Sequence, residues 1–356
     1  KTRVLTDRVA RLLLGDVPPQ NILCLTYTKA AASEMQNRLF RRLGDWAMRE
    51  DDELRAALAG LGVDAALSGD TLAKARRLFA RAIETPGGLK IQTIHSFCAG
   101  LLRRFPLEAG VSPGFTELDD VATAALQTEV LDAVAVQAPE IFAEVAALIG
   151  DADLTGLAAE ISAHRSLMPG APDRDAVLAL YDLPAGFDAG AALAALESAC
   201  DGAPFAAIAE VLEGQSKTMV SLAALLRQVP ESGIDLPCFE ALARACLYAS
   251  GDARHRPKPS ALTKNAREAL GPLAEDFDDF ADAIAATRQA FLALEATRRT
   301  LAVHRFAAAF LPEYARRKED GGWLDFDDQI ERAEALLAQP GVADWVLYKL
   351  DGGLDH

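Results

Sequence analysis

The stretch ILCLTYTKAAASEMQNRL, residues 22–39, decides the fold, because a strand and a helix follow each other directly within it. Residues 22–25 form a short, continuous apolar run, which is typical of a strand buried on both faces of a parallel sheet. The next three residues are predicted to make the turn. Residues 29–43 are predicted to form the helix, which we expect to end at Gly44.

A second stretch, IQTIHSFCAGLLRRF at residues 91–105, repeats this arrangement. Residues 89–94 alternate like a strand, and a helical pattern follows up to Phe105. Amphipathic patterns also predict helices from the second residue to Gly15 and over residues 70–84. This order predicts an α/β fold with a parallel sheet and helices on both faces, whose ligands bind at the carboxyl ends of the strands.

Composition excludes several classes of protein. The chain has 356 residues, of which 51% are hydrophobic and 25% charged, so it can bury a core and is not globally disordered. It has no apolar run of the roughly 18 to 20 residues that a bilayer-spanning helix needs, and residues 1–15 do not have the pattern of a signal peptide. Five cysteines without CxxC spacing argue against a disulfide framework or a zinc ribbon and fit a reducing cytosol.

Charge is distributed unevenly along the chain. The net charge is −16, but residues 1–110 carry 17 Lys and Arg against 12 Asp and Glu, a net charge of +5. The remainder carries 19 basic and 40 acidic residues, a net charge of −21. Such asymmetry indicates a local site for a polyanion in the first third of the chain.

Residues 115–320 are rich in alanine, leucine and acidic side chains, and their periodicity predicts an all-helical region large enough for a domain. One basic stretch interrupts it, and its prolines predict an exposed loop that is either simply solvated or in contact with duplex DNA. The basic residues of that stretch are Arg254, Arg256, Lys258 and Lys264. A basic run at residues 316–318 is expected to end a helix, where its charge suits the dipole.

A helical pattern resumes at Trp323 and begins with three acids, Asp325, Asp327 and Asp328. Their spacing lacks the glycine and the distal glutamate of a calcium loop. We therefore expect a helix cap and first-turn acids rather than a metal site. No catalytic Ser/His/Asp or Cys/His set and no nuclease carboxylate cluster is identifiable in the sequence.

The two strand–helix stretches together resemble the motifs that follow the P-loop in UvrD-like superfamily 1 DNA helicases, in the RecB and AddA branch. The usual UvrD pattern is TFTNKAAxEM, and residues 26–35 read TYTKAAASEM, with Lys29 one place earlier than the usual lysine. TIHSFC at residues 93–98 matches the branch well. WLDFDDQI at residues 323–330 resembles the helix that re-enters the first RecA-like domain, and residues 354–356 resemble the lead-in to the Walker B strand.

This resemblance implies a RecA-like P-loop domain interrupted by a large all-helical inserted domain. The first part of the RecA-like domain would be residues 1–110, the inserted accessory domain 111–320 and the return 321–356. Length, acidity and alanine content most resemble the AddA helicase–nuclease proteins of bacterial double-strand-break repair. The chain would then be an internal piece that begins inside Walker A, stops before Walker B and is inactive alone, with any nuclease domain downstream.

The resemblance also assigns roles to individual residues. Lys1 would stabilise charge on the transferred phosphate of ATP, and Thr2 would ligate Mg²⁺. The DNA strand would be held by Tyr27, Thr28, Lys29, Thr93, His95 and Ser96. Each of three has a plainer alternative: core packing for Tyr27, a helix N-cap for Thr28 and a hydrogen-bonded structural histidine for His95.

The implied function is ATP-dependent translocation on single-stranded DNA in the three-prime to five-prime direction, in the bacterial cytoplasm. Its partners would be single-stranded and duplex DNA and an AddB-like protein, with no membrane. One alternative is a UvrD-type repair helicase without a nuclease. The other, from a different class, is a non-catalytic acidic helical adaptor, which the acidity of residues 111–356 favours.

Overall fold

The computed structural model describes residues 2–62, 68–85, 88–149, 153–251, 253–351 and 354–356. The chain divides into two compact units. Unit 1 comprises residues 1–126 and 314–356, and unit 2 comprises residues 127–313. The predicted division of the chain at residues 110 and 320 stays a prediction.

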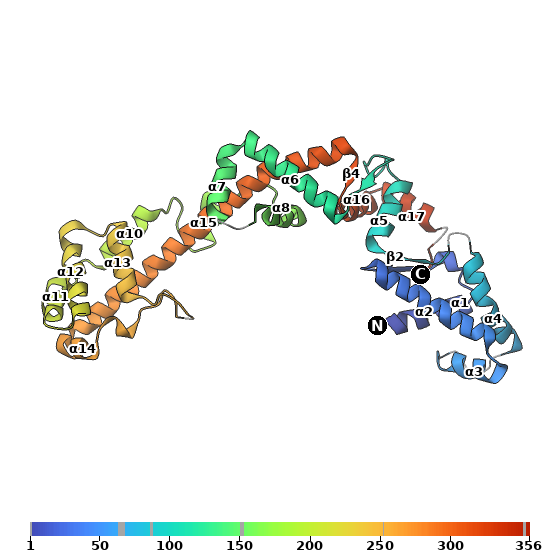
Figure 1. The fold of residues 1–356 in the computed structure, drawn as a ribbon, viewed down its shortest axis with the longest axis horizontal. Coiled ribbons are helices and arrows are strands. Elements are labelled where there is room, and N and C mark those ends of the chain that lie inside the picture. The colour runs from blue at the N-terminus through green and yellow to red at the C-terminus, as the bar shows by residue number, and fades with distance from the viewer. Residues whose placement is uncertain (1, 63–67, 86–87, 150–152, 252, 352–353) are drawn as a thin grey trace. The chain divides into compact units, whose positions relative to one another are not determined.

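Unit 1 is an α/β unit, as the sequence predicts (Figure 1). Its first part runs α1 (Thr2–Leu14), η1 (Pro19–Asn21), β1 (Leu23–Thr26), α2 (Lys29–Met48), α3 (Asp51–Ala59), α4 (Gly69–Glu84), β2 (Lys90–Thr93), α5 (Ile94–Arg104) and β3 (Thr116–Glu117). Its second part runs β4 (Trp323–Leu324), α16 (Phe326–Ala338) and α17 (Val342–Asp351). Two helices, α6 (Asp120–Gln137) and α15 (Leu273–Gly321), cross from one unit into the other.

Strands β1 and β2 pair in parallel, with Leu23 opposite Lys90 and Thr26 opposite Thr93. Residues 354–356 lie along the start of β1. The amide of Leu23 donates to the carbonyl of His356 at 2.8 Å, and the amide of His356 donates to the carbonyl of Asn21 at 3.1 Å. This alternation of bonds is the pattern of a parallel ladder, so the segment continues the sheet next to β1.

One face of the β1–β2 sheet packs on α1, α2 and α4 (Figure 1). Ile91 contributes to this core from β2, and Leu39, Leu43 and Trp46 contribute from α2. The prediction that α2 ends at Gly44 is wrong, because the helix continues to Met48. A Cβ on Gly44 would lie 3.7 Å from the ring of Phe79 in α4, which is an ordinary contact distance, so this position lies where the two helices pack and does not end α2.

On the other face, α5 lies against the sheet and α16 packs on α5. A small cavity of about 170 Å³ separates Gln92 and Lys90 from the α5 side chains Ser96 and Phe97. Beyond it, Leu102 of α5 and Phe105, directly after this helix, share a core with Leu336 of α16. Helices therefore cover both faces of the sheet.

A second small sheet forms where the chain leaves unit 1 and where it returns. Strands β3 and β4 pair in parallel, with Thr116 opposite Trp323. The amide of Thr116 donates to the carbonyl of Gly322 at 3.0 Å, and the amide of Leu118 donates to the carbonyl of Leu324 at 2.9 Å. The outgoing and returning segments, far apart in the sequence, are thus held side by side.

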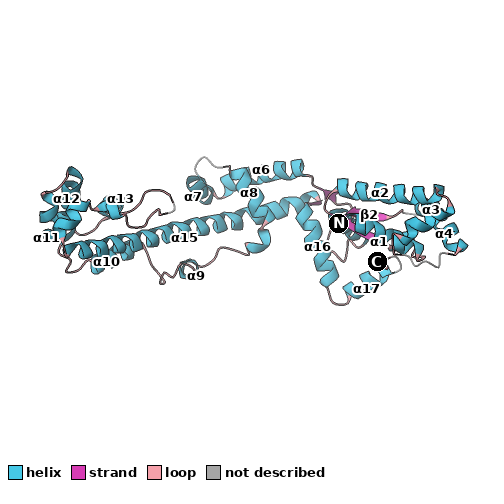
Figure 2. Cartoon of the chain, turned by 90° about the horizontal axis from the view of Figure 1, so that it is seen from below, coloured by secondary structure: helices cyan, strands magenta, loops and turns pink. Residues whose placement is uncertain are grey.

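Among its described residues, unit 2 consists of helices and the loops between them, with one isolated bridge, as the periodicity predicts. Its helices are α7 (Pro139–Ile149), α8 (Leu154–Ala163), α9 (Arg174–Ala179), α10 (Ala189–Ala199), α11 (Phe205–Glu213), α12 (Lys217–Ser232), α13 (Leu236–Cys246) and α14 (Lys264–Leu270), with the short turns η2 (Arg165–Leu167) and η3 (Pro259–Ala261). Helices α11 to α14 gather around one end of α15 (Figure 1), and Figure 2 shows α11, α12 and α13 near that end. Phe239 and Phe277 lie at the centre of this core.

All five cysteines are free thiols, and three of them are buried. Within the described ranges, no helix combines the length and the apolar character that crossing a bilayer requires.

Candidate nucleic-acid interface

The carboxyl ends of β1 and β2 meet at one edge of the sheet, because Thr26 lies opposite Thr93 in the parallel register. The Thr26 hydroxyl donates to the carbonyl of Thr28 at 3.1 Å and lies 3.4 Å from the carbonyl of Gln92. These bonds fix the turn after β1 against the neighbouring strand. The structure therefore brings together the two predicted groups of site residues, which are far apart in the chain.

Helix α2 begins at this edge. The Thr28 hydroxyl accepts a hydrogen bond from the amide of Ala31 at 3.1 Å, so the predicted N-cap role of Thr28 is confirmed. Tyr27 has 86% of its surface exposed, which excludes the core-packing alternative for this side chain. Lys29 is also exposed at the first position of α2. An exposed aromatic ring, a cation and a helix N-terminus thus lie together.

Helix α5 begins at the same edge in the same way. The buried Thr93 hydroxyl accepts from the amide of Ser96 at 3.1 Å and lies 2.8 Å from the Ser96 hydroxyl. Thr93 is therefore primarily an N-cap, whereas Ser96 is exposed. The half-buried imidazole of His95 packs on Phe326 of α16, with the ring centroids 4.9 Å apart and the planes 55° apart.

Phe326 is not among the predicted site residues, and a buried ionic network holds it in place. Lys318, 5% exposed, lies 2.6 Å from a carboxylate oxygen of both Asp325 and Asp328. The Tyr314 hydroxyl donates to Asp325 at 3.0 Å. Asp325 and Asp328 also form a capping box at the start of α16, which confirms the predicted cap.

The prediction that the basic run at residues 316–318 ends a helix is confirmed at Lys318. The structure adds a second role for this side chain that the sequence analysis does not predict. Lys318 does lie in the last turn of α15, but its ammonium group is buried and is neutralised by two carboxylates. The sequence signal that could have indicated this is the pair of acids seven and ten residues later, which a short turn folds back onto the helix.

The predicted nucleotide residues lie at the start of α1. Lys1 lies outside the described residues. Thr2 is the first residue of the helix and is half-buried, and its carbonyl accepts a hydrogen bond from the Thr6 hydroxyl at 2.9 Å. Across the described parts of the chain, no group of three or more His, Cys, Asp or Glu side chains is arranged to hold a metal ion.

The basic stretch of unit 2 has the exposed character that its sequence predicts at three of its four basic residues, including Lys264 at the start of α14. Arg254 and Arg256 are exposed, while Lys258 is half-buried and donates from its ammonium group to the carbonyl of Arg244 at 2.9 Å. The loop folds back on Leu247 through an antiparallel bridge to Pro257. His255 adopts a φ of 67°, and burial together with the nearby Arg254 and Arg288 lowers its pKa.

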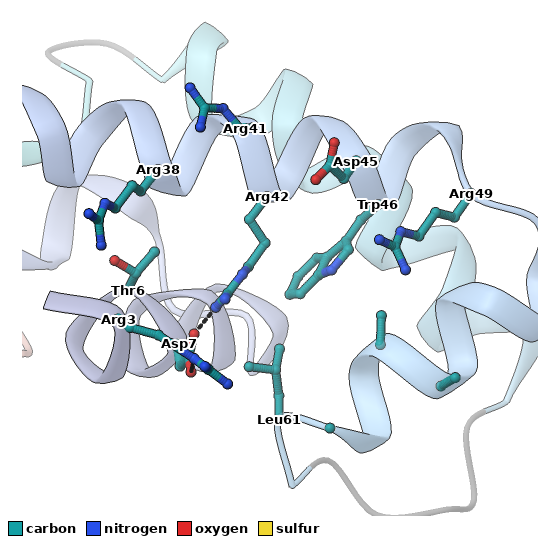
Figure 3. Close-up of a pocket in the computed structure, with 13 residues that line it drawn as sticks. Arg3, Thr6, Asp7, Arg38, Arg41, Arg42, Asp45, Trp46, Arg49 and Leu61 are labelled. Atoms are coloured by element: carbon teal, nitrogen blue, oxygen red, sulfur yellow. Dashed lines mark hydrogen bonds and ion pairs between the residues drawn. The ribbon is translucent and has the colours of Figure 1, made fainter. Parts of the chain in front are cut away.

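Sequence reasoning missed a cavity of about 540 Å³ among α1, α2 and α3 (Figure 3). Its charged lining residues are Arg3, Asp7, Arg38, Arg41, Arg42, Asp45 and Arg49. Arg42 forms an ion pair with Asp7 across the two helices. The arginines that recur along α2 are the available sequence signal for this cavity. Because the predicted helix ends at Gly44, however, these arginines lie near its expected C-terminus and are interpreted as complementing the helix dipole.

Comparison with known proteins gives a consistent picture. The sequence profile of the UvrD/REP helicase N-terminal domain matches residues 1–351. The AddA subunit of an ATP-dependent helicase/nuclease from Lactobacillus gasseri is 34% identical over 131 residues, which are 36% of this chain and 9% of that protein. Proteins of the same name from Moorella thermoacetica and Enterococcus faecalis are 31% and 32% identical over 137 and 134 residues, or 38% and 37% of this chain.

These matches extend over only 8% and 9% of the Moorella and Enterococcus proteins, so the chain spans a small part of the length of its relatives. The family profile, in contrast, covers nearly all of the chain and includes both strand ends and the return into unit 1. The chain therefore belongs to the UvrD/REP helicase family, as its N-terminal domain.

Proposed function

We propose that this chain is part of an ATP-dependent DNA helicase that acts in double-strand-break repair and recombination. The observation that carries the proposal is the parallel pairing of Thr26 with Thr93, which places two capped helix N-termini at one sheet edge. Helix N-termini attract phosphate groups because their amides and dipole favour negative charge. Two of them side by side suit two phosphates of one strand.

The surrounding side chains support a grip on single-stranded DNA. Tyr27 is free to stack on a base, which contributes about 1–3 kcal/mol per base in comparable proteins. Lys29 and Ser96 are exposed beside the two N-termini and can contact phosphate oxygens. Thr28 and Thr93 shape the helix starts, and His95 is positioned by Phe326.

Nucleotide binding is assigned to the start of α1. Lys1 and Thr2 would hold the phosphates and Mg²⁺ of ATP, which supplies the free energy for translocation. In support, Thr2 opens a helix of 13 residues, whose N-terminus suits an anion. Because α1 packs on α2, a shift of α1 would reach the helix that begins at the DNA grip.

The fold supports a RecA-like domain with a helical insertion. Residues 354–356 extend the parallel sheet beside β1, where a Walker B strand is expected. The pairing of β3 with β4 holds the outgoing and returning segments together, as an insertion requires. We assign residues 1–110 and 321–356 to the RecA-like domain and residues 111–320 to the accessory domain, whose Arg254 and Arg256 would contact duplex DNA.

Further properties are proposed from the AddA relatives, which are named as helicase/nuclease proteins. The protein would move along DNA in the three-prime to five-prime direction and bind an AddB-like partner. It would be located in the bacterial cytoplasm and carry a nuclease domain outside residues 1–356. Residues 1–356 alone should not turn over ATP, because the P-loop glycines and the Walker B acids expected from the family are not among them.

The test is ATP hydrolysis, with and without oligothymidine, by the complete natural protein that contains residues 1–356, which is called the full chain from here on. Lys1→Ala should abolish turnover under both conditions, because it removes the positive charge that would stabilise the transferred phosphate. Lys29→Ala and Tyr27→Ala should leave turnover without DNA unchanged and raise the DNA concentration for half-maximal stimulation. Arg11→Ala, an exposed cation on α1 away from the strand ends, is the matched control.

Three outcomes would contradict the proposal or part of it. A well-folded full chain without any turnover would favour the acidic adaptor, for which the −21 charge of residues 111–356 is the supporting observation. Unwinding of a duplex with a five-prime tail, but not with a three-prime tail, would overturn the direction. Unwinding without nuclease activity in the full chain would favour a UvrD-type repair helicase.

A further inference from the structure

The cavity among α1, α2 and α3 is a strongly cationic concave surface. Five arginines and two aspartates are the charged residues among those described that line it. Figure 3 shows Arg38 and Arg42 of α2, and Arg49 directly after it, on the side of Arg3 and Asp7 of α1, whereas Arg41 points away from them. This local surplus of positive charge contrasts with the −16 that the chain as a whole carries.

The arginines differ in how far they are already neutralised. Arg42 is ion-paired with Asp7, and burial together with the nearby Arg3 lowers its pKa. Arg38 pairs with Glu34 at 2.5 Å, but both side chains are about half exposed, so solvent screens this pair. Arg49 is exposed, and its guanidinium has no ion-pair partner among the described side chains. Arg38 and Arg49 therefore remain available to a further anion.

Helix α2 connects this cavity to the sheet edge. The helix starts at Lys29, and Arg38 follows nine residues later, or about 14 Å along the axis at roughly 1.5 Å per residue. A single strand held at the sheet edge needs to continue over only a few nucleotides to reach Arg38. Helix α2 thus begins at the sheet edge and also lines the cavity.

The lining favours phosphates over bases. Trp46, the aromatic residue of the cavity, is only 3% exposed and so offers no face for stacking. Guanidinium groups bind phosphate in bidentate fashion without reading the base.

We propose that this arginine cavity is a second contact for the backbone of single-stranded DNA, independent of base sequence, with Arg38 and Arg49 as phosphate ligands. The contact lengthens the track of DNA that the first unit holds and continues it along α2. The proposal rests on the proposed function, because it assumes that a strand is held at the sheet edge.

The test measures DNA affinity of the full chain as a function of KCl. Fluorescein-labelled oligothymidines of roughly 6 to 30 nucleotides bracket the site sizes of single-strand-binding proteins. The slope of log K against log[KCl] is negative, and each phosphate contact contributes roughly 0.7 to its steepness. For long strands, the double variant Arg38→Ala/Arg49→Ala should therefore make the slope shallower by about 1.4. The shortest strands that bind should show no change, since the sheet edge alone holds them.

Two further variants sharpen the result. Arg8→Ala/Arg11→Ala removes the same charge from α1 at positions outside the cavity and should leave the slope unchanged at every length. Arg38→Lys/Arg49→Lys keeps the charge and should restore most of the slope. Circular dichroism verifies that each variant is folded.

The outcomes separate this inference from the proposed function. Equal slopes for the cavity variant and the α1 control at every length would overturn the second contact while leaving the sheet-edge site intact. A second result would also overturn the inference: polyglutamate binds at the cavity, while Arg38→Ala/Arg49→Ala leaves the salt dependence of DNA binding unchanged. That result would assign the cavity to an acidic protein. Failure of the unmodified chain to bind any strand would overturn the proposed function first.

Discussion

At the scale of the residue, Thr93 illustrates how one hydroxyl organises the interface. It caps α5 through the Ser96 amide and also contacts the Ser96 hydroxyl. Thr93→Ala should therefore destabilise the first turn of α5 by about 1 kcal/mol, the usual cost of a lost cap. Hydrogen exchange at the Ser96 amide should become about fivefold faster.

Thr93→Ser is the matched control, because it keeps the accepting oxygen. It should restore slow exchange at Ser96. Equal exchange rates in Thr93→Ala and the unmodified chain would show that the cap contributes nothing to the order of this turn.

The buried thiols give a second prediction at this scale. Burial raises the pKa of Cys246 to about 12, and burial together with the nearby Glu197 raises the pKa of Cys200 to about 11. Since the thiolate is the reactive form, iodoacetamide near neutral pH should modify these two cysteines only after unfolding. Mass spectrometry of alkylated peptides measures this, and rapid native labelling of Cys246 would contradict its burial.

The direction of the pH effect follows from the same pKa values. A folded-state pKa of about 12 for Cys246 lies above the ordinary thiol value of 9.0, so folding favours the neutral thiol. Its contribution to stability is complete below the ordinary value of 9.0 and is lost as the pH rises toward about 12. Unit 2, which contains Cys246, should therefore lose stability at strongly alkaline pH.

At the scale of the element, the junction of α15 and α16 depends on a buried charge. Lys318 is 5% exposed and neutralises Asp325 and Asp328. Lys318→Ala should cost about 3–5 kcal/mol, because two carboxylates are left buried without a counter-charge. Protease cleavage near Gly322 and a lower unfolding temperature would report the loss.

Arg299→Ala is the control on the same helix. Its ion pair with Glu295 is exposed, with 62% and 39% of the two side chains accessible, and should contribute less than about 1 kcal/mol. If Lys318→Ala were as stable as Arg299→Ala, the buried network would not be what fixes α16 and, through Phe326, the position of His95.

The continuation of α2 past Gly44 shows where element boundaries escape sequence reasoning. A glycine after a helical pattern predicts a C-terminus, but Leu43 and Trp46 on either side of it are buried in the same core. Their burial stabilises the next turn by more than the roughly 1 kcal/mol that an interior glycine costs. The extension carries Arg49 to the cavity.

At the scale of the whole molecule, unit 2 contains a core of its own. The core of buried residues between Leu196 and Ile284 draws only on α10 to α15 and the loops between them. Residues 187–292 expressed alone should therefore be helical and should unfold cooperatively, as followed by circular dichroism. Phe239→Ala, at a site that is 0% exposed, should lower their stability by about 3–5 kcal/mol.

Val220→Ala is the control for this segment, because Val220 is 43% exposed and its truncation leaves no cavity. A gradual, non-cooperative melt of residues 187–292 would show that the core needs the rest of the chain.

The sequence by itself determined the α/β class of unit 1, the helical character of unit 2, the caps at Thr28 and Asp325, and the family. These depend on local patterns: apolar runs, periodicity and capping chemistry act within a few residues. The order of the motifs also placed the two strand ends at one edge, because parallel strands align their carboxyl ends.

Only the tertiary structure decided the exposure of Tyr27, the contact of His95 with Phe326, the burial of Lys318 and the arginine cavity. Each depends on segments far apart in the chain, or on how helices pack, and no local pattern encodes such contacts. Arg38 and Arg49 look like ordinary surface charges in the sequence. They become a site because α1 and α3 close around α2 and turn a helix face into a concavity.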